Sequence, residues 1–154
     1  CTAQLQDPAT LAPLIDATEQ CFPPLPSVSQ PDPPGPNLED RQAVVQGLAR
    51  VVSSLDPLSA TEAGKKLVTT LTNRAAQLLH LPPGAEPAPS QSTALAAELA
   101  LVASVIKFMD NFSSAPPNAQ PVQPPGLAML EAAWPVLAQV VQQPSWRSQQ
   151  CVAD

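Results

Sequence analysis

Residues 94–109 read ALAAELALVASVIKFM, and this stretch gives the clearest indication of the fold. Apolar side chains occupy nearly every position, so a helix formed here is apolar around most of its circumference. It is too short to cross a bilayer, which needs about 20 residues, and it carries Glu98 and Lys107. Such a helix needs neighbours on more than one side. We therefore interpret it as the central, buried helix of a helical core, beginning with Ser90 or Ser92 as N-cap and ending near Phe112.

Two amphipathic helices are predicted before this stretch. Residues 38–55 follow Asn37, a good N-cap, and carry Glu39 and Asp40 in the first turn. Their apolar residues recur at steps of three and four: Val44, Val45, Leu48, Val51, Val52 and Leu55, with Arg41, Gln42, Gln46, Arg50 and Ser53 on the other side. A second helix is expected from a capping box, Ser59 with Glu62, to about His80. Its apolar residues are Ala60, Ala63, Leu67, Leu71 and Leu78. The short connection predicts an antiparallel hairpin.

Further helices are predicted nearer the two ends. Residues 126–143 form a helix with Leu127, Leu130, Ala133, Trp134, Leu137 and Val140 as its apolar residues. A kink is expected in it at Pro135. A shorter helix is expected over 11–21, and another begins after Pro144.

Proline separates these helices. The chain has 21 prolines, and most fall within 23–36, 82–89 and 116–125, which leaves the segments between them nearly free of helix breakers. The fold class expected is all-α, an α-solenoid of HEAT-like antiparallel helix pairs with proline-rich loops, because the pairs can bury their apolar faces only against one another. The expected organisation is 1–22 as the end of a preceding repeat, 23–36 as a proline-rich linker, 37–81 and 82–143 as helix pairs, and 144–154 as the start of a further repeat.

Composition disfavours several functions. A net charge of −6 argues against binding of nucleic acid, because affinity for phosphates comes mainly from Lys and Arg. No signal peptide or membrane span is predicted. Three widely spaced cysteines, Cys1, Cys21 and Cys151, fit a reducing cytosolic or nuclear compartment better than a disulfide framework.

Catalytic chemistry has few candidates. His80 is the single histidine, so a catalytic triad would have to use it and a His-based metal site would lack partners. At a helix end it more commonly interacts with the last carbonyls. The acidic pairs Glu39 with Asp40 and Asp16 with Glu19 fit first-turn or solvated carboxylates. We expect no enzyme activity, no cofactor and no metal.

Several residues are candidates for protein contacts, each with a plainer interpretation. Lys65, Lys66 and Arg74 suit an acidic partner or a solvated helix face. Trp134 suits a binding anchor or, more commonly, a core position beside Pro135, and Trp146 is ambiguous. The stretch Phe22–Pro26 suits a proline-reading module or a plain linker.

Two short matches are discounted. Asn111–Ser113 fits a glycosylation pattern without a signal peptide, and Cys151–Asp154 resembles a prenylation tail with an atypical last residue. No protein-binding residue is assigned.

Four stretches resemble the importin-β type of nuclear transport receptor, in the branch of transportin-SR and importin thirteen. They are Cys1–Leu5, Gln46–Val52, Glu98–Ile106 and Glu131–Leu137, the last ahead of a helix start at Trp146. The long proline-rich loops depart from the family. The resemblance implies an internal fragment of an import receptor in cytoplasm and nucleus. Its full-length parent would bind protein cargo, the Ran GTPase and nucleoporins, without nucleic acid or membrane. The alternative is another helical-repeat scaffold with no transport role.

Overall fold

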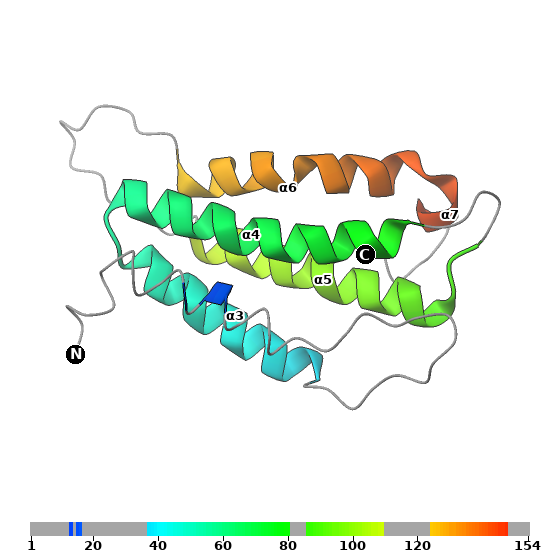
Figure 1. Cartoon of the computed structure of the whole chain (residues 1–154), viewed down its shortest axis with the longest axis horizontal. Coiled ribbons are helices and arrows are strands. Elements are labelled where there is room, and N and C mark those ends of the chain that lie inside the picture. Colours follow the sequence, from blue (N-terminus) through cyan, green and yellow to red (C-terminus); the bar gives the residue numbers. More distant parts are fainter. Residues whose placement is uncertain (1–12, 14, 17–36, 81–85, 110–123, 148–154) are drawn as a thin grey trace.

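The computed structural model describes residues 13, 15, 16, 37–80, 86–109 and 124–147 (Figure 1). Its helices are α3 (Leu38–Ser53), α4 (Pro57–Leu79), α5 (Pro89–Met109), α6 (Pro125–Gln142) and α7 (Pro144–Arg147). Among these residues there is no strand, which confirms an all-α chain. Of the helix expected over 11–21, Pro13, Ile15 and Asp16 are described and are helical. The linker over 23–36 lies outside the described residues.

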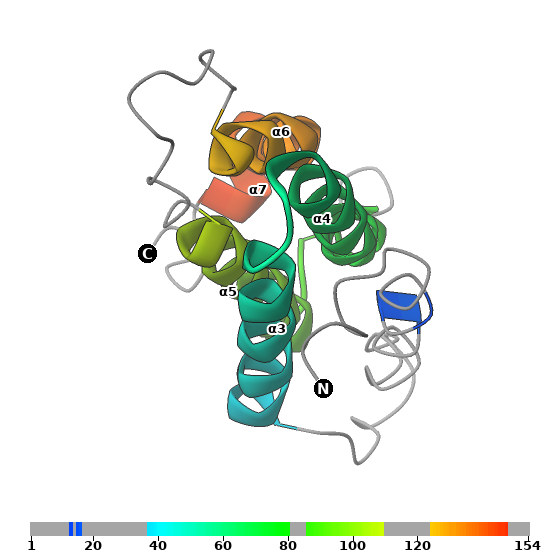
Figure 2. The same cartoon turned by 90° about the vertical axis from the view of Figure 1, so that its left-hand side faces the viewer.

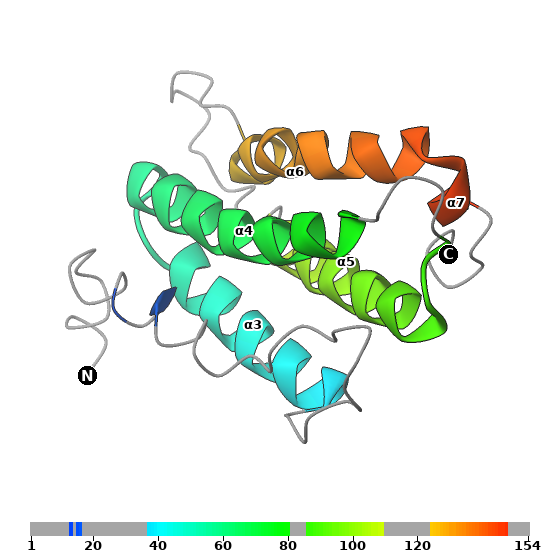
Figure 3. The ribbon, with the colours of Figure 1, turned by 45° about the vertical axis from the view of Figure 1, so that its right-hand side comes forward.

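The long helices run alternately in opposite directions, so α3 and α5 point one way and α4 and α6 the other (Figure 1). The two consecutive helix pairs are α3 with α4 and α5 with α6. Contacts between these two pairs are more extensive than contacts within either pair. Helix α4 packs mainly against α6 and α5, and α3 packs mainly against α5. Viewed along their length, α3 lies beside α5 and α4 lies beside α6 (Figure 2), and a third view agrees (Figure 3). The two pairs therefore bury their apolar faces against each other, as the sequence predicts.

Helix starts differ from the prediction in two of three cases. Asn37 caps α3 as expected, with its Oδ1 accepting the N–H of Asp40 at 2.8 Å. The capping box predicted at Ser59 is wrong, because α4 begins earlier. Asp56 is its N-cap, and its Oδ1 accepts hydrogen bonds from the N–H groups of Leu58 and Ser59, both at 3.2 Å. Pro57 occupies the first position of the helix. Carboxylate capping and N1 proline together outweigh the later Ser signal.

The start of α5 was also predicted wrongly, because the helix begins at Pro89 rather than after Ser90 or Ser92. Ser92 is buried within it and its hydroxyl donates to the carbonyl of Ala88 at 3.3 Å. The described part of this helix ends at Met109, so Phe112 lies outside the described residues. Pro135 lies inside α6, and the helix continues through it.

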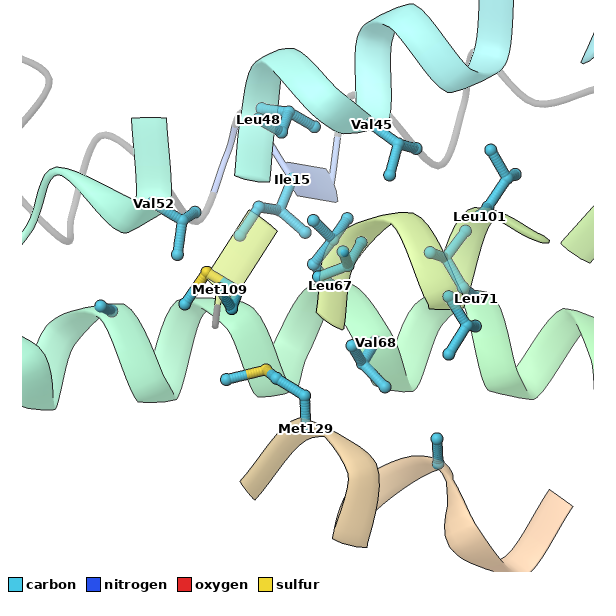
Figure 4. Packing of buried hydrophobic residues seen from close by; sticks show 14 of the residues in the cluster. Ile15, Val45, Leu48, Val52, Leu67, Val68, Leu71, Leu101, Met109 and Met129 are labelled. Carbon is cyan, nitrogen blue, oxygen red and sulfur yellow. The ribbon is translucent and has the colours of Figure 1, made fainter. Parts of the chain in front are cut away.

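The main core lies between α3, α4, α5 and α6 (Figure 4). Leu101 and Val105 of α5 are completely buried there, as are Leu67 and Leu71 of α4 to within 1%. Ile15 also belongs to this core. The sequence correctly identifies the stretch 94–109 as a central helix, since it touches all three neighbours.

A second apolar cluster closes one end of the molecule. It contains Ala75, Leu78, Leu79, Leu95, Val136, Val140 and Trp146. Trp146 comes from the short α7 and is fully buried. By length and hydropathy α5 is the described helix that could cross a membrane. Core helices have the same properties, and α5 packs against α3, α4 and α6.

Candidate protein-binding surface

Three charged side chains, Glu98, Arg41 and Arg74, meet between the helices. Glu98 of α5 is 1% exposed. Its Oε1 accepts hydrogen bonds from Arg41 Nη2 of α3 at 2.5 Å and from Arg74 Nε of α4 at 3.2 Å. Placing Arg41 on the polar side of its helix was therefore wrong. Its long side chain reaches the one carboxylate of α5, and burial of that carboxylate requires a paired cation.

The basic contact surface considered for α4, as the alternative to a solvated helix face, is consequently not assembled. Arg74 turns inward to Glu98. Lys66 forms an ion pair with Asp16 at 2.7 Å, and both side chains are about half exposed, so this pair contributes little stability. Lys65 is exposed. These three residues do not form a surface for an acidic partner, because Arg74 is partly buried against Glu98 and Lys66 is already paired with Asp16.

An apolar stripe on α6 is the most prominent exposed apolar feature among the described residues. It consists of Leu127, Leu130, Trp134 and Val141, which are 45%, 38%, 62% and 64% exposed. With 3.6 residues per turn, these four positions lie within about 60° of the helix circumference. Leu127 and Val141 are 14 residue steps apart, or about 21 Å along the axis. We call this set the α6 stripe.

The core position expected for Trp134 is wrong. The buried face of α6, which includes Met129, Ala133, Val136 and Val140, turns toward α4 and α5. Trp134 lies on the other side. The sequence could not choose between these faces, because apolar residues surround most of α6. Trp146, left ambiguous, is the tryptophan that fills the core.

The stripe is also poor in charge. Glu131 is the only ionisable side chain of α6, and it lies at the edge of the stripe by helical phase. The neighbouring outer positions are Pro135, Gln139 and Gln142, which are all exposed. An exposed apolar row whose margin carries two glutamines, a proline and one carboxylate is typical of a protein contact surface rather than of a solvated helix.

The catalytic candidates are dispersed. His80 is exposed and is the C-cap residue of α4, and its backbone N–H donates to the carbonyl of Gln77 at 3.4 Å. Glu39 and Asp40 are exposed in the first turn of α3, as predicted. In the described ranges no three His, Cys, Asp or Glu side chains come together as metal ligands.

The remaining sequence candidates lie outside the described residues. They are the stretch Phe22–Pro26, the pattern Asn111–Ser113, the tail Cys151–Asp154 and the cysteines Cys1 and Cys21. Glu19 belongs to the same group, whereas its expected neighbour Asp16 pairs with Lys66.

No protein-family model, no curated protein and no solved structure matches this chain. The resemblance to importin-β receptors therefore depends on the sequence stretches alone.

Proposed function

We propose that this chain is a helical protein-binding scaffold and that the α6 stripe is its contact surface. The observation that carries the proposal is the position of Trp134, which stands 62% exposed between two leucines and a valine on the same face. Tryptophan is among the residues that contribute most to protein interfaces. Water contact with such a row is unfavourable, and burying it against a partner removes that cost.

At the level of family, we propose a segment of an importin-β-type nuclear import receptor. Its HEAT-like helix pairs would form part of a solenoid that carries cargo through nuclear pores under control of the Ran GTPase. Two observations support this proposal. Four stretches of the sequence resemble the family, and consecutive antiparallel pairs lie side by side. Cargo, Ran and nucleoporins would be partners of the complete receptor in cytoplasm and nucleus.

A pull-down with Ran tests the family. The complete protein that contains this chain is expected to retain Ran loaded with a non-hydrolysable GTP analogue and to release the GDP form. Equal retention of both forms, or of neither, excludes the transport role. A helical-repeat scaffold with no transport role is then the remaining candidate, since the side-by-side packing of helix pairs fits it equally well.

The contact surface itself is tested separately. Trp134→Glu should weaken binding of the protein's partners, whereas Leu58→Glu should not. Leu58 is a matched control because it is an apolar residue that is 74% exposed on a different helix, α4. Equal effects of the two substitutions would remove the α6 stripe from the proposal.

A further inference from the structure

The spacing of the α6 stripe is symmetric about Trp134. Leu127 and Val141 each lie seven residues from it, and Leu130 and Ala138 each lie four residues from it. All five positions fall within about 80° of the helix circumference. Ala138 is partly buried and the other four are exposed. Reading the helix in either direction therefore gives the same arrangement of apolar positions.

We propose that the α6 stripe binds the α6 stripe of a second copy of this chain, with the two helices antiparallel. The inference rests on the proposed role of the stripe as a protein-binding surface, and it names the partner. A two-fold contact uses the same patch on both copies, so each position must meet its mirror position. Here Leu127 meets Val141 of the second copy, Leu130 meets Ala138, and Trp134 lies at the axis.

Residue sizes suit this register. The larger Leu130 faces the small Ala138, and the pair repeats on the other side of the axis. Alternation of large and small residues lets facing helices interdigitate. The two Trp134 rings meet at the axis, where offset or edge-to-face aromatic contacts are favourable.

The distribution of charge also favours the α6 stripe as the contact between two copies. Each copy carries a net charge of −6, so two copies repel each other wherever acidic side chains come together. Helix α6 presents a single carboxylate, Glu131. In the antiparallel register the two Glu131 positions lie on opposite sides of the two-fold axis. They are about 9 Å apart along the direction of the helices. Both stay at the edge, where water screens them.

Sedimentation equilibrium of the whole chain at about 1 to 300 µM tests the association, because small interfaces dissociate in this range. The expected result is a monomer–dimer equilibrium. Trp134→Glu should raise the dimer dissociation constant at least about tenfold, and Leu58→Glu should leave it unchanged. Circular dichroism establishes that both variants are folded.

Disulfide trapping tests the register. In a background with Cys1, Cys21 and Cys151 replaced by serine, copies carrying Leu127→Cys are mixed with copies carrying Val141→Cys. Oxidation should link the two kinds of copy to each other. Copies with Leu127→Cys alone should not link, because their cysteines lie about 21 Å apart. Efficient linkage of these copies to themselves would overturn the antiparallel register.

A monomer at every concentration overturns the proposal, as does dimerisation that survives Trp134→Glu. The dimer proposal is also overturned if, in the complete protein, a helix from elsewhere in the same chain covers the α6 stripe. The protein-binding scaffold survives the first and third results if Trp134→Glu still weakens binding of other partners. The scaffold fails when Trp134→Glu and Leu58→Glu behave alike in both kinds of assay.

Discussion

Glu98 joins three helices through a single carboxylate oxygen. Arg41 and Arg74 both bond to Oε1, whereas Oε2 is buried and has no hydrogen-bond partner in the described part of the chain. Two cations and one anion in a core are not a strong source of stability, because each charge is removed from water. Their effect is to fix α3 and α4 against one position of α5.

Removing the charge of Glu98 should strongly lower the stability of the fold. Glu98→Gln keeps the size of the side chain but removes the buried negative charge to which both guanidinium groups are bonded. Breaking a buried ion pair in this way costs about 3 to 5 kcal/mol. Urea unfolding measures the change, and Glu62→Gln, at an exposed position of α4, should stay within about 0.5 kcal/mol. Equal stability of the two variants would contradict the buried position of Glu98.

Gly64 permits the close approach of α6 to α4. A Cβ atom at Gly64 would lie 2.5 Å from Cε and 2.7 Å from Sδ of Met129, and 3.3 Å from Cε of Met109. Both methionines are completely buried. At Gly47 of α3 a Cβ atom meets nothing within 4 Å. Gly47 and Gly64, both inside helices, therefore differ in what surrounds them.

Opposite outcomes are expected for alanine at these two sites. Gly47→Ala should stabilise the protein by up to about 1 kcal/mol, the helix-propensity difference. Gly64→Ala gains the same propensity but forces Met129 to move within a packed core, at a cost of about 1 to 3 kcal/mol. Thermal unfolding should therefore place Gly64→Ala below the wild type. A gain in melting temperature equal to that of Gly47→Ala would show that α6 is not packed on Gly64.

At the scale of single helices, patterns in the sequence located all four long helices and their approximate ends. They failed where two signals competed, as at Asp56 and Ser59 before α4. They also failed to predict which side of a helix faces the core. Periodicity assigned Val44 to the apolar side of α3, yet it is 47% exposed, and Arg41 to the polar side. Arg41 points to Glu98 on a neighbouring helix, and no local pattern contains that information.

The capping carboxylate of Asp56 makes the start of α4 sensitive to acid. Hydrogen bonds from the side chain and backbone of Ser59, and from the backbone of Leu58, hold the pKa of Asp56 below its ordinary value of 3.8. The unfolded chain therefore takes up this proton first. The stabilising contribution is complete above the unfolded pKa and is lost as pH falls through the folded pKa.

Asp56→Asn should remove this dependence, because an asparagine caps helices nearly as well and does not titrate. Urea midpoints measured from neutral pH to about pH 2 should fall less steeply for the variant than for the wild type at the acid end. Parallel curves throughout would mean that the carboxylate of Asp56 does not cap α4.

At the scale of the whole molecule, the apolar character of α5 predicted its central place, and the need to cover every apolar helix predicted that the pairs would pack together. What could not be predicted is the exposed α6 stripe. Its residues resemble core residues in every local respect. They are exposed because α4 and α5 cover the opposite face of α6, and Trp146, from beyond that helix, takes the buried tryptophan position.

Leu101→Ala tests the central position of α5. Leu101 is completely buried, so its truncation should cost about 2 to 5 kcal/mol through lost burial and an unfilled cavity. Chemical denaturation measures the loss, with Leu58→Ala as the exposed counterpart expected to change little. An unchanged melting temperature for Leu101→Ala would be incompatible with this packing.

The central claim is that the α6 stripe is an exposed surface that becomes covered when proteins associate. Fluorine NMR of the chain labelled with 5-fluorotryptophan tests it most directly, because the chain has two tryptophans and Trp134→Phe assigns their signals. In dilute solution the Trp134 signal should respond to exchange of H₂O for D₂O while the Trp146 signal does not. As concentration rises, the response of Trp134 should diminish. A Trp134 signal that is shielded at every dilution, or that stays equally exposed at all concentrations and with every partner, would contradict the claim.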